Sequence, residues 1–192
     1  MRNGVFVPMI LLLAVLLAGC GKSERDTAEG LRSRFVETAG CTMEAAVSCD
    51  QDGTLWRGVF RCSYVPDGES IVEALEPESI AGVCAVLDGE KQSLRFAGKN
   101  LNAGAVSAEA ISPAACLPRM MDALRGGWLL EENQEAWNGV PCWRLALDQS
   151  GEQVEKVEFV FWLRQEDGMP LRGEISVDGE TVLTAEFTTF TF

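Results

Sequence analysis

CTMEAAVSCDQDGTLWRGVFRCSY, residues 41–64, is the stretch that decides the fold. Apolar and polar side chains alternate with a period of two on both sides of Asp52-Gly53, a dipeptide typical of tight hairpin turns. If these two residues form the loop, the apolar residues face one another in pairs. The pairs are Cys49–Trp56, Val47–Gly58, Ala45–Phe60, Met43–Cys62 and Cys41–Tyr64. A slip by one residue would turn one apolar set to the polar face, so the pattern predicts a β-hairpin in this register.

The same register places Cys41 and Cys62 on one face and diagonally adjacent, which makes them the favoured disulfide pair. A loop one residue longer would shift the pairing. Apart from Cys20, the chain has an even number of cysteines, as expected of disulfides outside the cytoplasm. The alternative is that several cysteines are simply small buried side chains.

An amphipathic helix is predicted immediately before the hairpin, over residues 27–39. Its apolar residues recur at spacings of three and four, namely Ala28, Leu31, Phe35 and Ala39. Asp26 or Thr27 can accept hydrogen bonds as the N-cap, and Gly40 can end the helix.

The chain beyond the hairpin continues the alternating pattern. The further predicted strands are residues 70–76, 80–87, 92–97, a short one near Leu101, 128–132, 142–147, 157–164, 171–178 and 181–192. Ser112-Pro113 begins a helical segment, with a first turn at 113–117 and a helix at 118–125, because Pro118 breaks a single smooth helix. A β-bulge near Thr188-Thr189 would return Phe190 and Phe192 to the inner face.

These elements predict a mainly β (α+β) domain with about eleven antiparallel strands and two helices. Nearly every strand has one polar face, so one side of the sheet faces water. Two short helices cannot cover the other side unless the sheet curls around them. No repeat, linker or internal domain boundary interrupts the pattern.

The first twenty residues carry a different signal. Arg2 precedes an apolar run, Val5 to Ala18, that is shorter than the roughly 20 residues of a membrane-spanning helix and is typical of a signal peptide. The run ends in Leu17-Ala18-Gly19-Cys20, which resembles the lipobox of bacterial lipoproteins. The resemblance implies a diacylglycerol on the Cys20 sulfur and cleavage before it; an ordinary signal peptide is the alternative. The expected organisation is a signal peptide (1–19), a lipidated cysteine and tether (20–26), and one domain (27–192).

Composition narrows the functions that the domain can have. The chain has no histidine, which removes every Ser-His or Cys-His nucleophile pair and the commonest zinc ligand. We therefore expect no enzyme, no metal and no cofactor. A formal net charge of -13 disfavours nucleic acid and anionic bilayers as partners, so attachment to the membrane would depend on the lipid at Cys20.

The order of these elements resembles the LolA/LolB-like superfamily of lipoprotein-sorting carriers, and most nearly LolA-like lipoproteins of spore-forming bacteria with a single membrane. The segments that carry the resemblance are VEALEPESIAG (72–82), ISPAACLP (111–118), FWL (161–163), MPLRGEI (169–175) and TAEFTTFTF (184–192). The resemblance implies an eleven-stranded half-barrel closed on its concave side by the N-terminal helix and the helix near 113–125. It also implies an apolar cavity that holds a lipid or the acyl chains of a lipoprotein, at the outer face of the cell membrane.

We predict that large apolar residues on the inner face line this cavity. They are Phe35, Met43, Trp56, Phe60, Tyr64, Met120, Met121, Trp143, Phe159, Phe161 and Phe187. The alternative is that most of them are ordinary core. A second functional hypothesis is a module that docks an envelope enzyme, such as a spore cell-wall amidase, for which Trp162 and Trp137 are candidate surface residues.

Overall fold

Eleven antiparallel strands form one sheet in the computed structural model, which describes residues 27–51, 54–89, 91–96, 99–101, 112–150 and 156–192. The strands are β1 (Cys41–Gln51), β2 (Thr54–Tyr64), β3 (Glu69–Glu76), β4 (Val83–Asp88), β5 (Lys91–Phe96), β6 (Lys99–Leu101), β7 (Trp128–Trp137), β8 (Val140–Asp148), β9 (Val157–Arg164), β10 (Pro170–Val177) and β11 (Glu180–Thr191). The helices are α2 (Ala28–Glu37) and α3 (Cys116–Gly126). The mainly β fold predicted from the sequence is confirmed.

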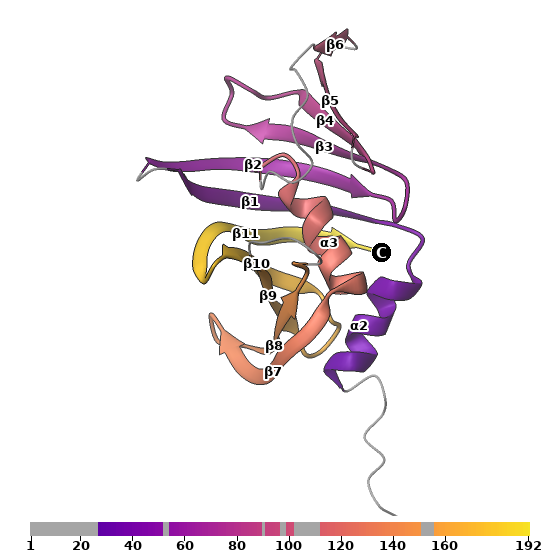
Figure 1. The fold of residues 1–192 in the computed structure, drawn as a ribbon, viewed down its shortest axis with the longest axis vertical. Coiled ribbons are helices and arrows are strands. Elements are labelled where there is room, and N and C mark those ends of the chain that lie inside the picture. The colour runs from indigo at the N-terminus through magenta and orange to yellow at the C-terminus, as the bar shows by residue number, and fades with distance from the viewer. Residues whose placement is uncertain (1–26, 52–53, 90, 97–98, 102–111, 151–155) are drawn as a thin grey trace, which may run out of the picture.

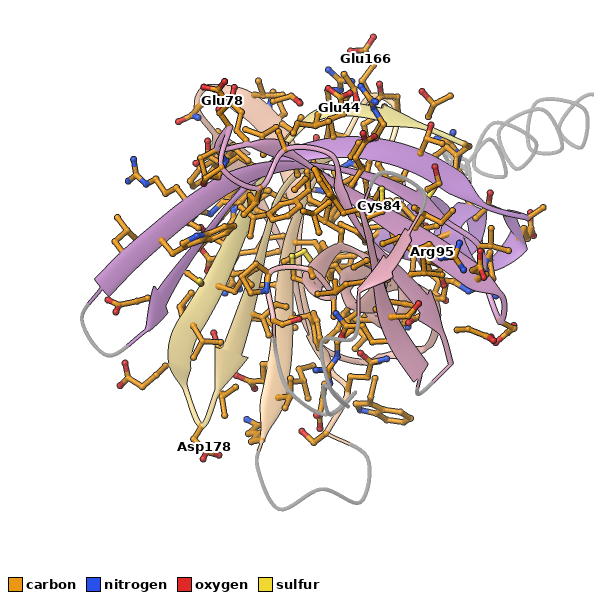
Figure 2. The ribbon with its side chains drawn as sticks, turned by 90° about the horizontal axis from the view of Figure 1, so that it is seen from above. Glu44, Glu78, Cys84, Arg95, Glu166 and Asp178 are labelled. Atoms are coloured by element: carbon orange, nitrogen blue, oxygen red, sulfur yellow. The ribbon has the colours of Figure 1, made fainter. Side chains whose placement is uncertain are left out.

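The sheet is built from two series of hairpins that meet in its centre. Its order is β6-β5-β4-β3-β2-β1-β11-β10-β9-β8-β7, so the first and last strands pair with each other and β6 and β7 are the two edges. The sheet curls into an open arch with side chains gathered inside it, while Glu44 stands on the outer face (Figure 2). Both helices lie against the hollow of the sheet, and α3 crosses it (Figure 1). The arrangement is a half-barrel.

The hairpin of β1 and β2 has the predicted register. Ala45 faces Phe60, Cys49 faces Trp56 and Cys41 faces Tyr64. The predicted bulge is also present, because Glu44 pairs with Thr189 whereas Ala45 pairs with Phe187, which leaves one residue of β11 extra. The bulge returns Phe190 to the core.

The ends of three elements differ from the prediction. The strand expected at 80–87 begins at Val83, because residues 77–82 form turns in which the Ile80 amide bonds the Pro77 carbonyl at 3.0 Å. The strand expected at 128–132 runs on to Trp137. Helix α3 begins at Cys116, so Pro118 lies in its first turn, where the missing N–H needs no partner.

Two arginines tie the helices to each other. Arg32 of α2 donates from Nε to the Leu124 carbonyl at 2.8 Å and from Nη2 to the Gly127 carbonyl, at the C-terminal end of α3. Arg125 of α3 donates in return to the Phe35 and Val36 carbonyls of α2, at 3.0 and 3.1 Å. Each guanidinium therefore satisfies carbonyls at the C-terminal end of the other helix and lies at its negative pole. We call this exchange the arginine clamp.

Candidate functional site

One side of the concave face is filled. Helix α3 lays Met120 against β10, where a Cβ on Gly173 would lie 2.9 Å from the Met120 sulfur. A side chain at this position would have to displace the Met120 side chain, so Gly173 lets α3 pack closely on β10. Leu117, Met121 and Leu124 are also almost fully buried. The β8–β11 side of the half-barrel is accordingly a packed core.

Most of the predicted cavity residues belong to this filled side. Those exposed by 1% or less are Phe35, Met43, Met120, Met121, Phe159 and Phe161. Trp143 is buried as well, and Phe187 packs partly buried against the core. For these eight residues the structure agrees with the alternative that they are ordinary core.

The other side of the concave face is hollow. A cavity of about 290 Å³ lies between strands β2–β5 and the turn that leads into α3. Two of the predicted residues, Trp56 and Phe60, line it, with ring centroids 5.7 Å apart. The rest of its lining is mostly aliphatic: Val72, Ala74, Ile80, Val83, Ala85, Gln92, Leu94, Ser112, Pro113 and Ala114.

Small residues open this space. Ala74 and Ala85 stand at inward positions of β3 and β4, where larger side chains would fill the cavity. The Trp56 indole packs against Gly58. A Cβ at this position would come within 2.6 Å of the indole, so the glycine leaves room for the ring.

A second cavity of about 550 Å³ continues along the same strands. The two share Gln92, and Ala114 borders the first while Ala115 borders the second. On β3, Val72 faces the apolar cavity and Ser70 the polar one. Together they form one trough between strands β2–β5 and residues 112–122, apolar at one end and polar at the other. We refer to these ends as the apolar half and the polar half.

Tyr64, the third predicted residue that lines the trough, belongs to the polar half. Its hydroxyl donates to Asp122 Oδ1 of α3 at 2.5 Å. Partial loss of hydration raises the Asp122 pKa from its ordinary value, although the hydrogen bond from Tyr64 and the charge of Arg125 oppose the shift. Arg119, one turn earlier, also borders this half, and burial lowers its pKa.

The sequence prediction missed the aliphatic residues of β3–β5 and the polar residues of α3. Periodicity identified their strands, but it could not tell which inward residues α3 would cover. A usable signal was the small size of Ala74, opposite Phe60 on β2, and of Ala85, opposite Val72 on β3. Spacing along α3 also places Arg119 and Asp122 three residues apart, on one face of the helix.

The tryptophan pair proposed as a docking surface is packed. Trp162 is 7% exposed, and its Nε1 donates to Glu135 Oε1. Its ring lies 5.3 Å from that of Trp137, and the Arg172 guanidinium stacks over Trp137 at 4.6 Å. Neighbouring side chains therefore cover Trp162, which was predicted to be a surface residue.

The structure has Cys41 and Cys62 as free thiols, so the expected disulfide is not formed in it. Cys41 faces Tyr64, which leaves Cys62 in the diagonal position. Diagonal residues of an antiparallel pair have Cα atoms about 7–8 Å apart, whereas disulfides need roughly 4.4–6.8 Å. Cys41 and Cys62 share the buried inner face, as predicted, and the usual diagonal separation disfavours a bridge between them.

Comparison with known proteins finds similarity in structure alone. No protein-family model and no curated protein matches the sequence. An uncharacterized conserved protein from Thermus thermophilus superposes with a TM-score of 0.50 at 16% identity, over 86% of this chain and 87% of that one. NE2245, a LolA superfamily protein from Nitrosomonas europaea, has a TM-score of 0.45 at 13% identity, over 86% of this chain and 93% of that one. LprF from Mycobacterium bovis reaches 0.46 at 11% identity, over 85% and 93%.

The described residues hold neither a membrane-spanning helix nor a cluster of metal-binding side chains. Neither α2 nor α3 is long and apolar enough to cross a membrane, and no other helix in the described ranges is either. Within the same ranges, no group of three or more Cys, Asp or Glu side chains could hold a metal ion. Cys20 and the tether, residues 20–26, lie outside the described part of the chain.

Proposed function

We propose that this chain is a lipoprotein of the cell envelope, held at the outer face of the membrane by a lipid on Cys20, that binds a lipid or an acyl chain in the trough. The observation that carries the proposal is the apolar half. Its volume of about 290 Å³ is at the lower end of ordinary ligand pockets, roughly 300–1,000 Å³. That size suits one acyl chain better than a bulky ring system.

The shape of the trough supports an amphiphile as the ligand. Apolar walls favour a hydrocarbon chain because they remove its surface from water, at about 25 cal/mol per Å². Tyr64, Gln92 and Asp122 supply hydrogen-bonding groups at the polar half, where a head group would lie. A ligand of this kind is also what the resemblance of the sequence to LolA-like lipoproteins implies.

The anchor would keep the trough near its ligand. The tether of six residues, 21–26, spans at most about 20 Å when extended. It leads into α2, which the arginine clamp joins to α3, and the turn before α3 borders the trough. A lipid leaving the bilayer would therefore have a short path to the site.

The docking of an envelope enzyme is the weaker hypothesis. It comes from the resemblance to LolA-like lipoproteins, with Trp137 and Trp162 as candidate surface residues, and Trp162 is buried beneath arginines and its neighbouring tryptophan. We propose a binding protein without catalytic activity of its own.

Lipid extraction tests the proposal. All the described strands and helices lie in residues 27–192, so a chain of residues 20–192 with Cys20→Ser keeps them without an attached lipid. Purified without detergent, it should carry lipid that mass spectrometry detects. Ile80→Trp should fill the apolar half and remove this lipid. The matched control is Ile71→Trp on the exposed face of β3, which should retain it. A folded chain that carries no lipid and binds no added acyl chain would contradict the proposal.

A further inference from the structure

The polar half of the trough carries more negative than positive side chains. Three carboxylates line it, from Asp67, Asp88 and Asp122, and they face one lining guanidinium, from Arg119. Arg125 lies nearby, with its Nη2 3.9 Å from Asp67 Oδ2, but the same side chain donates to the carbonyls of α2 in the arginine clamp. With Arg125 counted, carboxylates still outnumber guanidinium groups at this end.

The charged groups are placed where a head group would lie. Asp122 is held by Tyr64, which is fixed in β2, so its carboxylate has a defined position on the wall. Asp67 stands in the turn that follows β2, with its side chain 98% exposed, and Asp88 is the last residue of β4; both border the polar half. A chain seated against Trp56 and Leu94 would direct its head group toward these carboxylates.

We infer that the polar half selects the head group of the amphiphile. It accepts a single-chain amphiphile whose head carries a protonated amine, and it disfavours an anionic head such as a carboxylate or a phosphate. The inference rests on the proposed function, because it assigns a ligand class to the same trough. Its basis is charge complementarity. A cation gains most from Asp122, whose carboxylate is partly desolvated, and less from the solvated Asp67 and Asp88, whereas an anion has Arg119 as the one lining cation and is repelled by the carboxylates.

Three probes with the same chain length separate the contribution of the head group to the affinity from that of the hydrocarbon chain. They are dodecylamine, dodecanol and laurate, measured by titration calorimetry below their critical micelle concentrations, at pH 7 and low salt. The protein is the 20–192 chain with Cys20→Ser. Dodecylamine should bind at least about 10-fold more tightly than laurate, a difference of about 1.4 kcal/mol, with dodecanol between them. The ratio should shrink in high salt, because the carboxylates are partly solvated.

Matched variants separate the effect of the carboxylates in the trough on the affinity ratio from the effect of the net charge of the whole chain. Asp122→Asn can still accept the Tyr64 hydrogen bond and should lower the amine-to-laurate ratio at least threefold. Glu132→Gln, on the exposed edge strand β7, removes the same charge away from the trough and should leave the ratio unchanged.

The outcomes distinguish the two proposals. Equal affinities for the three probes, tighter binding of laurate, or a ratio that Glu132→Gln lowers as much as Asp122→Asn would overturn the head-group inference and leave the proposed function standing. A failure of dodecanol to bind would overturn the proposed function itself, since this probe needs only the apolar half.

Discussion

At the scale of single residues, size and burial decide what each inward position does. Ala74 and Ala85 leave space between the strands, whereas Met120 and Phe161 fill it. Strand alternation predicted that Phe161 faces inward and helical spacing placed Met120 on the apolar side of its helix, and both residues are buried. Neither pattern could predict which inward residues border an opening, because that depends on which ones α3 covers, and α3 is distant in sequence.

Buried thiols should make the protein sensitive to alkaline pH. Burial raises the pKa of Cys41 from 9.0 to about 12, and it raises the pKa of Cys62 well above 9.0. The unfolded chain loses these protons near pH 9 and the folded chain does not. The contribution to stability is therefore complete below pH 9 and is lost as the pH rises toward 12. For Cys41 alone it is on the order of 4 kcal/mol.

Urea unfolding under reducing conditions, followed from pH 8 to pH 11, measures this loss. The midpoint should fall steadily above pH 9, and it should fall less steeply in Cys41→Ala, which lacks one of the titrating groups. A midpoint that is constant across this range, or an identical slope in the variant, would count against buried neutral thiols.

At the scale of elements, the alternation of side chains and the turn residues were enough to predict a strand's register where one face is apolar and the other polar. The β1–β2 hairpin was predicted pair by pair, because its apolar face and Asp52-Gly53 agree on one register. The edge strand β7 was predicted too short, because almost all of its residues are exposed and no alternation marks its second half. Pairing with the backbone of β8 defines that strand, and side-chain pattern does not reveal such pairing.

Removal of either arginine of the clamp should destabilise the helix pair. Each guanidinium donates to backbone carbonyls that are otherwise left at a helix end, so Arg32→Ala or Arg125→Ala should cost about 1.5–3 kcal/mol of unfolding free energy. Lysine at either position should restore only part of this, since it lacks the planar fork. Urea denaturation monitored by tryptophan fluorescence gives the values.

The matched control for the clamp is Arg61→Ala. Arg61 pairs with Glu44 at 2.8 Å and with Glu73 at 3.3 Å, but its side chain is 52% exposed on the outer face. Surface pairs of this kind contribute about 0–1 kcal/mol. If Arg32→Ala and Arg61→Ala cost the same, the clamp has no special role in holding α2 to α3.

At the scale of the whole molecule, the sheet order explains why one trough exists. The first and last strands meet at the centre, so the chain must pass from the edge at β6 to the edge at β7, and α3 lies on this crossing (Figure 1). One helix seated on β10 fills the half near β8–β11 and leaves the half near β2–β5 open. The half-barrel was predicted from strand count and a shortage of helix, but the unequal filling follows from the path of α3.

The anchor is the remaining proposal for the whole molecule, and metabolic labelling tests it. The full chain, expressed in a bacterium supplied with radiolabelled palmitate, should incorporate label, and Cys20→Ser should abolish incorporation. Cys84→Ser is the matched control, because Cys84 is the least buried of the described cysteines and should leave labelling unchanged. Two or three acyl chains make attachment stable, so the wild-type chain should leave the membrane only with detergent and not with high salt. Palmitate on the Cys20→Ser chain, or none on the wild type, would contradict a lipid at Cys20. The trough would then have to meet its ligand without a tether, even though its geometry is unchanged.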